Sequence, residues 1–116
     1  MDSTSSVTAL AALAHEARLE IYRFLVKAGP SGLTVGTIGE KLGMPGATLS
    51  FHLSLLKHAG LVKARRDGRR LIQTADFDRM KGLIAYLTEN CCGGQSCVPV
   101  CKPAKTKPIK SKAARG

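Results

Sequence analysis

Length, composition and charge set the first limits on what this chain can be. Its 116 residues suffice for one domain with a modest core, but not for two independently folded domains. No apolar stretch approaches the roughly 18 residues that a membrane span requires, and the N-terminal residues lack the basic and apolar regions of a signal peptide. We therefore expect a cytoplasmic protein without a membrane partner.

Positive charge is concentrated at the C-terminal end. The chain has 18 basic and 8 acidic residues, and its net charge is +10. Six of the basic residues lie in the last fifteen positions, which hold no acidic residue: Lys102, Lys105, Lys107, Lys110, Lys112 and Arg115. This composition, with two prolines and one large apolar residue, predicts a disordered tail over residues 102–116. The tail is either an electrostatic arm for phosphates or a solubilising segment.

Three helices are expected in the first part of the chain. Residues 7–13 form a short apolar run among alanines, and residues 15–28 place apolar side chains at helical spacings before Gly29 and Pro30 stop the helix. The apolar residues at these spacings are Leu19, Ile21, Tyr22, Leu25 and Val26. Thr34 can cap a short third helix that ends at Gly43.

A fourth helix begins at Pro45 and extends to Gly60. Proline is tolerated in the first turn of a helix because its missing N–H has no partner there in any case. The spacing i, i+4, i+7 predicts a buried stripe of Leu49, Leu53 and Leu56. The tight turn at residues 43–45 joins the third and fourth helices, as in a helix-turn-helix.

The pattern changes after Gly60. Residues 61–74, LVKARRDGRRLIQT, hold two short runs separated by Asp67-Gly68, a dipeptide favoured in tight hairpin turns. A hairpin that directly follows a helix-turn-helix is the wing of a winged-helix domain. The predicted fold class is therefore mainly α with a small β-hairpin, a winged helix-turn-helix.

A last helix, DFDRMKGLIAYLTEN, can be capped by Asp76 and reaches Asn90. It carries an apolar stripe for which the chain offers no further partner; its members are Phe77, Met80, Ile84 and Leu87. Such a stripe is most readily buried against the first helix and a second copy of itself. The predicted assembly is accordingly a homodimer.

The fourth helix and the hairpin together favour binding to double-stranded operator DNA. A helix of this length fits the major groove, and a rotation of about 100° per residue from the leucine stripe turns Ala47, Phe51, Ser54 and His58 outward. The candidate DNA-binding residues are Ala47, Thr48, Ser50, Phe51 and His52 on the helix and Arg65, Arg66, Arg69 and Arg70 on the hairpin. The alternative is that Phe51 packs under another helix and the arginines form a solvated face. The agreement of turn, helix, basic hairpin and net charge favours DNA.

Three stretches resemble the ArsR/SmtB family of dimeric winged-helix repressors: LAHEARLEIYRFL, TVGTIGEKLGMPGATLSFHLSLLKHAGLV and the RRDGRR hairpin. The resemblance covers roughly residues 8–92, and LSFHLSLLKHAGLV is its most specific part. It implies that the helix from Pro45 is the recognition helix and that the first and last helices form the dimer interface. It also implies that a metal or metalloid releases the protein from DNA.

Two sensor sites of the family are missing from the sequence. The helix before the recognition helix, TVGTIGEKLG, has no thiol, whereas many arsenic sensors of the family carry a Cys-Val-Cys type motif there. The zinc sensors use Asp and His pairs on the last helix, but the histidines of this chain are all earlier: His15, His52 and His58. The remaining candidate is the cysteine-rich segment at residues 91–101, which resembles a subgroup of arsenite-responsive repressors.

The four cysteines of the chain all lie in this segment: Cys91, Cys92, Cys97 and Cys101. Trivalent arsenic is soft and favours three thiolates. Adjacent cysteines on a continuing helix would diverge by about 100°, but Gly93 and Gly94 allow the chain to fold back. The expected ligands are Cys91, Cys92 and Cys97, with Cys101 as a spare or alternative third ligand. Zinc or cadmium binding, oxidation or persulfide formation, a disulfide, and chemically inert cysteines are the alternatives.

These expectations divide the chain into a winged helix-turn-helix and dimerisation domain (1–92), a cysteine-rich metalloid-binding segment (91–101) and a basic tail (102–116). The predicted function is a repressor that leaves its operator when As(III), or alternatively Sb(III) or methylated As(III), binds the cysteines. A thiol-based metal-scavenging module is the rival interpretation. We expect no enzymatic activity, because paired carboxylates, a Cys–His arrangement and a phosphate loop are missing from the sequence.

Overall fold

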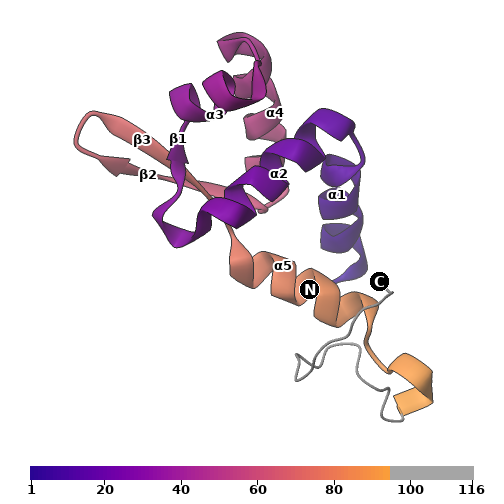
Figure 1. Cartoon of the computed structure of the whole chain (residues 1–116). Coiled ribbons are helices and arrows are strands. Elements are labelled where there is room, and N and C mark those ends of the chain that lie inside the picture. Colours follow the sequence, from indigo (N-terminus) through magenta and orange to yellow (C-terminus); the bar gives the residue numbers. More distant parts are fainter. Residues whose placement is uncertain (95–116) are drawn as a thin grey trace, which may run out of the picture.

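Helices form most of the described chain, and a small antiparallel sheet projects from them (Figure 1). The computed structural model describes residues 1–94, so Cys97, Cys101 and the basic tail over 102–116 lie outside the described residues. The elements are α1 (Ser3–Leu13), α2 (Glu16–Ala28), η1 (Gly29–Ser31), β1 (Leu33–Thr34), α3 (Val35–Leu42), α4 (Gly46–His58), β2 (Val62–Asp67), β3 (Arg70–Ala75), α5 (Phe77–Leu87) and η2 (Cys91–Gly94).

Side-chain caps set where the first helices begin. The carboxylate of Asp2 accepts a hydrogen bond from the Ser5 amide at 2.8 Å, so α1 starts four residues before the expected position. His15 is the N-cap of α2, and its Nδ1 atom accepts from the Ala17 amide at 3.1 Å. Both helices therefore gain a partner for one of the N–H groups that have none within a helix.

The helix-turn-helix is formed as the sequence predicts. The hydroxyl of Thr34 accepts from the Thr37 amide at 3.2 Å and caps α3, and Gly43 ends α3 in the left-handed conformation with φ of 63°. Helix α4 ends in a Schellman motif, because the Gly60 amide donates to Lys57 and the Leu61 amide donates to Leu56. These local signals fix both ends of α3 and the C-terminal end of α4.

The sheet has three strands in the order β1-β3-β2, all antiparallel. Strand β1 was not predicted, because its two residues are too few to leave a sequence pattern. The hairpin loop is Gly68-Arg69, because Asp67 still pairs with Arg70; the turn thus lies one residue after the predicted position. The connection to β1 passes very close to β3 at Gly32, whose φ is +70°, and a Cβ atom there would lie 2.5 Å from the Gln73 carbonyl oxygen.

The core confirms the predicted stripe of α4. Leu49 and Leu56 are fully buried and Leu53 is 2% exposed. On α2, Ile21, Tyr22 and Leu25 are buried. The other two apolar residues at helical spacings are exposed: Leu19 is 44% exposed and Val26 is 41% exposed.

Helix α5 is shorter than predicted and buries a different residue. It ends at Leu87 rather than Asn90, and the residue buried against the core is Leu83. Phe77 and Met80 are partly buried against the core, whereas Ile84 is 49% exposed and Leu87 is 57% exposed. Within one chain, the second half of the predicted stripe therefore remains uncovered. No helix in the described part of the chain is long and apolar enough to cross a membrane.

Candidate nucleic-acid interface and cysteine segment

Helix α4 presents an exposed face at its N-terminal half. Leu49, Leu53 and Leu56 anchor the helix on the core, and this orientation exposes Ala47, Thr48, Ser50 and Phe51. Phe51 is 59% exposed, so the alternative that it packs under another helix of the same chain is wrong. The face combines small and polar side chains with one aromatic ring, which suits hydrogen bonds to base edges and contact with a thymine methyl group.

His52 is a correction to the predicted interface. Its side chain is only 7% exposed and lies toward α2, where the ring centroid of His15 is 4.9 Å away. Residues 49, 52, 53 and 56 together form the i, i+3, i+4, i+7 pattern of a buried helix face, and this spacing is the signal that could have placed His52 inward. The prediction that His52 contributes to the DNA-binding face of α4 is therefore not supported, because its side chain is buried.

The arginines of the wing differ in their surroundings. Two nitrogens of Arg65 donate to carbonyl oxygens of the η1 segment, Nη1 to Pro30 at 3.3 Å and Nη2 to Ser31 at 3.2 Å. Arg66, Arg69 and Arg70 are exposed at the tip of the hairpin. The structure thus gives Arg65 an intramolecular role in fixing the wing and leaves the tip arginines as the stronger candidates for phosphate contact.

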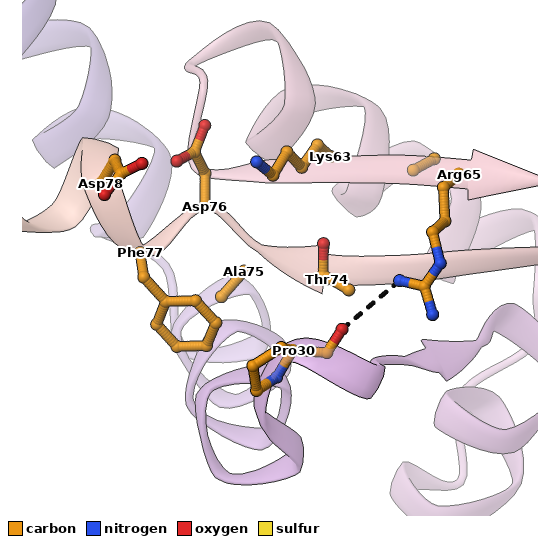
Figure 2. A pocket seen from close by; sticks show the side chains of 9 residues that line it. Pro30, Lys63, Arg65, Thr74, Ala75, Asp76, Phe77 and Asp78 are labelled. Carbon is orange, nitrogen blue, oxygen red and sulfur yellow. Dashed lines mark hydrogen bonds between the residues drawn. The ribbon is translucent and has the colours of Figure 1, made fainter.

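A pocket of about 580 Å³ lies at the base of the wing, where β2, β3, η1 and the start of α5 meet. Figure 2 shows the ring of Phe77 beside Pro30, with Lys63 and Asp76 on the opposite side of the pocket. One oxygen of Asp76 accepts from the Arg79 amide at 3.1 Å and caps α5. This pocket leaves no signal in the sequence, because its lining residues come from segments that are far apart in the chain.

Two polar groups of α2 and β3 are buried without a hydrogen-bond partner among the described residues. They are the hydroxyl of Tyr22 and the side-chain amide of Gln73. Burial, followed by the nearby charge of Asp76, raises the pKa of the Tyr22 hydroxyl above its usual value. Tyr22 therefore stays neutral at physiological pH.

The two described cysteines lie beyond the end of α5. The chain leaves the helix at Thr88, and Asn90 and Cys92 adopt left-handed conformations with φ of 57° and 58°. This path brings the Sγ atoms of Cys91 and Cys92 within 3.7 Å of each other on the surface. The divergence expected on a continuing helix does not arise, and the left-handed residues are Asn90 and Cys92 as well as the expected Gly93.

Other metal sites are not formed in the described part of the chain. Between residues 1 and 94, no three His, Cys, Asp or Glu side chains lie close enough together to hold a metal ion. The two remaining predicted ligands, Cys97 and Cys101, are outside the described residues. The described part of the cysteine segment holds two thiols, those of Cys91 and Cys92.

Taken together, a capped helix-turn-helix, an exposed recognition-helix face and an arginine-bearing wing define a winged helix-turn-helix DNA-binding protein. A family model described as a helix-turn-helix domain matches residues 13–65. The chain is 31% identical over 91 residues to the transcriptional activator HlyU of Vibrio cholerae, with 78% of this chain and 82% of HlyU covered. The chain belongs to the ArsR/SmtB-type family of winged helix-turn-helix transcriptional regulators.

Solved structures agree with this assignment. One is the homodimeric winged helix-turn-helix domain of a possible ArsR-family regulator from Mycobacterium bovis, with a TM-score of 0.60, 29% identity and coverage of 79% of this chain and 85% of that one. Another is a possible transcriptional regulator for arsenical resistance, with a TM-score of 0.58, 29% identity and coverage of 68% and 79%. The relatives are transcriptional regulators, which confirms the expectation that the chain is not an enzyme.

Proposed function

We propose that this regulator is a homodimeric repressor whose hold on operator DNA is released when trivalent arsenic binds a site formed by Cys91, Cys92 and a third thiol. The observation that carries the proposal is the 3.7 Å separation of the two sulfur atoms at the end of α5. Two sulfurs bound at about 2.3 Å to one tetrahedral ion lie about 3.8 Å apart. The pair is therefore already spaced for two bonds to a single thiophilic centre.

The third ligand is assigned to Cys97, with Cys101 as the alternative. Trivalent arsenic and antimony form three bonds to soft ligands, so a third thiol completes their coordination, whereas a methylated arsenical needs two. A helix C-terminus disfavours thiolate charge. Bonding to the metalloid must then drive deprotonation of the thiols, rather than a low resting pKa.

DNA binding is assigned to the exposed face of α4 and the wing. The helix would enter the major groove with Ala47, Thr48, Ser50 and Phe51 toward base edges, while Arg66, Arg69 and Arg70 meet phosphates or the minor groove. The resemblance to dimeric repressors and the homodimeric domain from Mycobacterium bovis support two copies on an inverted-repeat operator. Paired helices in successive turns of the groove then set the half-site spacing.

The dimer face is assigned to α1 and α5, which lie next to each other (Figure 1). Four large apolar side chains are exposed on these helices: Val7, Leu10, Ile84 and Leu87. An exposed apolar patch on a small domain marks a surface that another molecule covers. Leu87→Lys is expected to give monomers in sedimentation velocity. Val26→Lys, a similarly exposed position on α2, is the control, and dimers that persist in Leu87→Lys would remove α5 from the interface.

The cysteine segment follows α5 directly, and this position gives a route from the metalloid to DNA. Binding of the metalloid to the cysteine segment would change the C-terminal end of α5, which forms part of the proposed dimer face. This change would alter the spacing of the two recognition helices. Linkage requires that DNA weaken arsenic binding by the same factor; such couplings are typically about 1–3 kcal/mol.

The test is release of a fluorescent operator duplex, followed by anisotropy as arsenite is added. Single Ser variants of Cys91, Cys92 and Cys97 are each expected to need far more arsenite for release, while their affinity for DNA in its absence stays unchanged. If all four Cys→Ser variants, including Cys101→Ser, respond as the wild type does, the cluster is not the sensor. A reporter gene behind the operator separates repression from activation.

Zinc, cadmium, oxidation or persulfide formation at the same cysteines forms the second candidate, and the same sulfur separation supports it. The titration is repeated with zinc, cadmium, hydrogen peroxide and a polysulfide in place of arsenite. Release by one of these at lower concentration than by arsenite would reassign the inducer and leave the DNA-binding function intact. X-ray absorption at the arsenic edge then counts the bound sulfurs.

A further inference from the structure

A cluster of three basic side chains joins the recognition helix to the first two helices. His15 lies in the turn between α1 and α2, Arg18 lies on the first turns of α2, and His52 lies in the middle of α4. The rings of His15 and His52 have centroids 4.9 Å apart and are tilted by 50°. The DNA-binding role described above uses none of these three side chains.

Arg18 is the bridge of this cluster. Its Nε atom donates to the Ala12 carbonyl oxygen at 2.6 Å, at the end of α1, and its Nη1 atom lies 3.3 Å from Nδ1 of His52. A guanidinium can only donate hydrogen bonds, so Nδ1 of His52 must be the acceptor. The ring is then neutral and carries its proton on Nε2.

We propose that Arg18 and His52 form a proton-sensitive junction that positions the recognition helix, so that protonation of His52 weakens operator binding. Protonation at Nδ1 removes the acceptor and places a second positive charge 3.3 Å from the guanidinium. Because Arg18 is also held by the Ala12 carbonyl at the end of α1, the repulsion acts on α4. The binding-competent position of α4 is then disfavoured, and DNA binding requires a neutral His52.

The surroundings of His52 support the expectation that its protonation is unfavourable in the folded state. Burial lowers the pKa of His52 below its usual 6.5, and the neighbouring His15 and Arg18 lower the pKa further. The ionisable groups that act on the ring, His15 and Arg18, are thus both basic, and both come from the α2 side. In the unfolded chain the imidazole takes up a proton near pH 6.5. The folded state therefore loses stability as pH falls below about 6.5, until His52 is protonated in the folded state as well.

This direction is opposite to that of an exposed histidine at a DNA surface. Protonation of an exposed imidazole adds a positive charge that attracts phosphates and strengthens binding. A decrease in affinity at acidic pH therefore separates the junction from general electrostatics. Because a single proton is taken up by His52, the affinity for DNA can decrease by at most about tenfold per pH unit.

The experiment measures the affinity of the full-length protein between pH 5.5 and 8 at constant salt. The probe is a labelled duplex selected from random sequence by the wild-type protein at pH 7.5. Affinity is expected to fall toward acidic pH in the wild type. His52→Gln keeps a neutral acceptor for Arg18 and is expected to remove the fall, with affinity at pH 8 within about threefold of the wild type. His58→Gln, an exposed histidine on the same helix, is the control and is expected to keep the fall.

Two further measurements keep the outcome decisive. Thermal unfolding at pH 7.5 verifies that His52→Gln is folded, and Arg18→Lys is expected to retain part of the pH dependence because a lysine can still donate to His52. NMR titration of the His52 ring, with the α4 amides as reporters, does not need DNA. An unchanged pH profile in His52→Gln, or α4 amides that do not respond when the ring protonates, would overturn the proposal. Failure to select any duplex would count against DNA binding itself, and the NMR result would still decide the junction.

Discussion

The guanidinium of Arg65 donates to the carbonyl oxygen of Pro30 at 3.3 Å, which ties the wing to the segment that follows α2 (Figure 2). The same side chain also reaches the Ser31 carbonyl oxygen. An arginine that was expected to contact DNA thus has two partners within its own chain, although it is as exposed as its neighbours at the tip of the hairpin.

The first prediction separates these two roles. Arg69→Gln is expected to lower DNA affinity and to reduce the slope of log affinity against log salt by about one, because one phosphate contact is lost. Arg65→Gln is expected to leave that slope nearly unchanged and to destabilise the domain by about 1 kcal/mol through its lost hydrogen bonds. Anisotropy between 50 and 200 mM salt (about fourfold in range) and urea unfolding give the two numbers. Equal slope changes in both variants would assign Arg65 to the phosphate backbone as well.

The second prediction concerns the exposed ring of Phe51. If the ring contacts a thymine methyl group, replacing that thymine by uracil is expected to weaken binding about fourfold, equivalent to about 0.8 kcal/mol for one buried carbon. In Phe51→Ala the same base change is expected to have no effect, since the contact is already lost. Thymines are replaced one at a time across the selected duplex. Additive effects of Phe51→Ala and every uracil would show that the ring reads no methyl group.

The third prediction follows from the burial of Gln73, which is completely inaccessible and has no hydrogen-bond partner for either amide atom among the described residues. It shares a face of β3 with Ala75, a core residue. Gln73→Leu is expected to raise the free energy of unfolding by about 1–2 kcal/mol, because an unpaired buried amide is replaced by an apolar side chain of similar size. Urea unfolding measures the change. Tyr22→Phe, which removes a second unpaired group, is expected to be neutral or mildly stabilising.

A loss of stability in Gln73→Leu would show that the amide has a partner in solution. Water is one such partner, and slow exchange of the side-chain amide protons in the wild type would reveal it. In that case the polar group contributes to the packing of β3 against the helices.

The fourth prediction compares two glycines that lie four residues apart. At Gly32 the backbone has a φ of +70°, and a Cβ atom would meet the Gln73 carbonyl oxygen at 2.5 Å. Gly32→Ala is expected to lower the free energy of unfolding by at least about 2 kcal/mol, through combined backbone strain and steric overlap. Gly36 lies in α3 with nothing within 4 Å of its would-be Cβ atom. Gly36→Ala is therefore expected to be neutral or to stabilise by up to about 1 kcal/mol.

Chemical denaturation of both variants checks the comparison. Hydrogen exchange at the amides of β1 and β3 then locates the damage, which is expected to be concentrated where the two strands pair. A Gly32→Ala variant as stable as Gly36→Ala would mean that the close approach at Gly32 relaxes without separating β1 from the sheet.

The sequence alone determined the parts of this protein that depend on near neighbours in the chain. The leucine stripe of α4, the Thr34 cap and the glycine that ends α3 all act within a few residues, so periodicity and backbone preference suffice to predict them. The same local reasoning extended α5 too far and placed His52 on the DNA side, since one helix face does not reveal what packs against it.

Only the tertiary structure decided the long-range contacts. His52 meets Arg18 across 34 residues of sequence, and Arg65 meets Pro30 across 35. The two-residue strand β1 exists because β3 supplies its hydrogen bonds, and the cysteine sulfurs of residues 91 and 92 converge because the backbone turns left-handed after α5. Such features depend on which surfaces remain to be covered once the core has formed, and a local pattern carries no information about that.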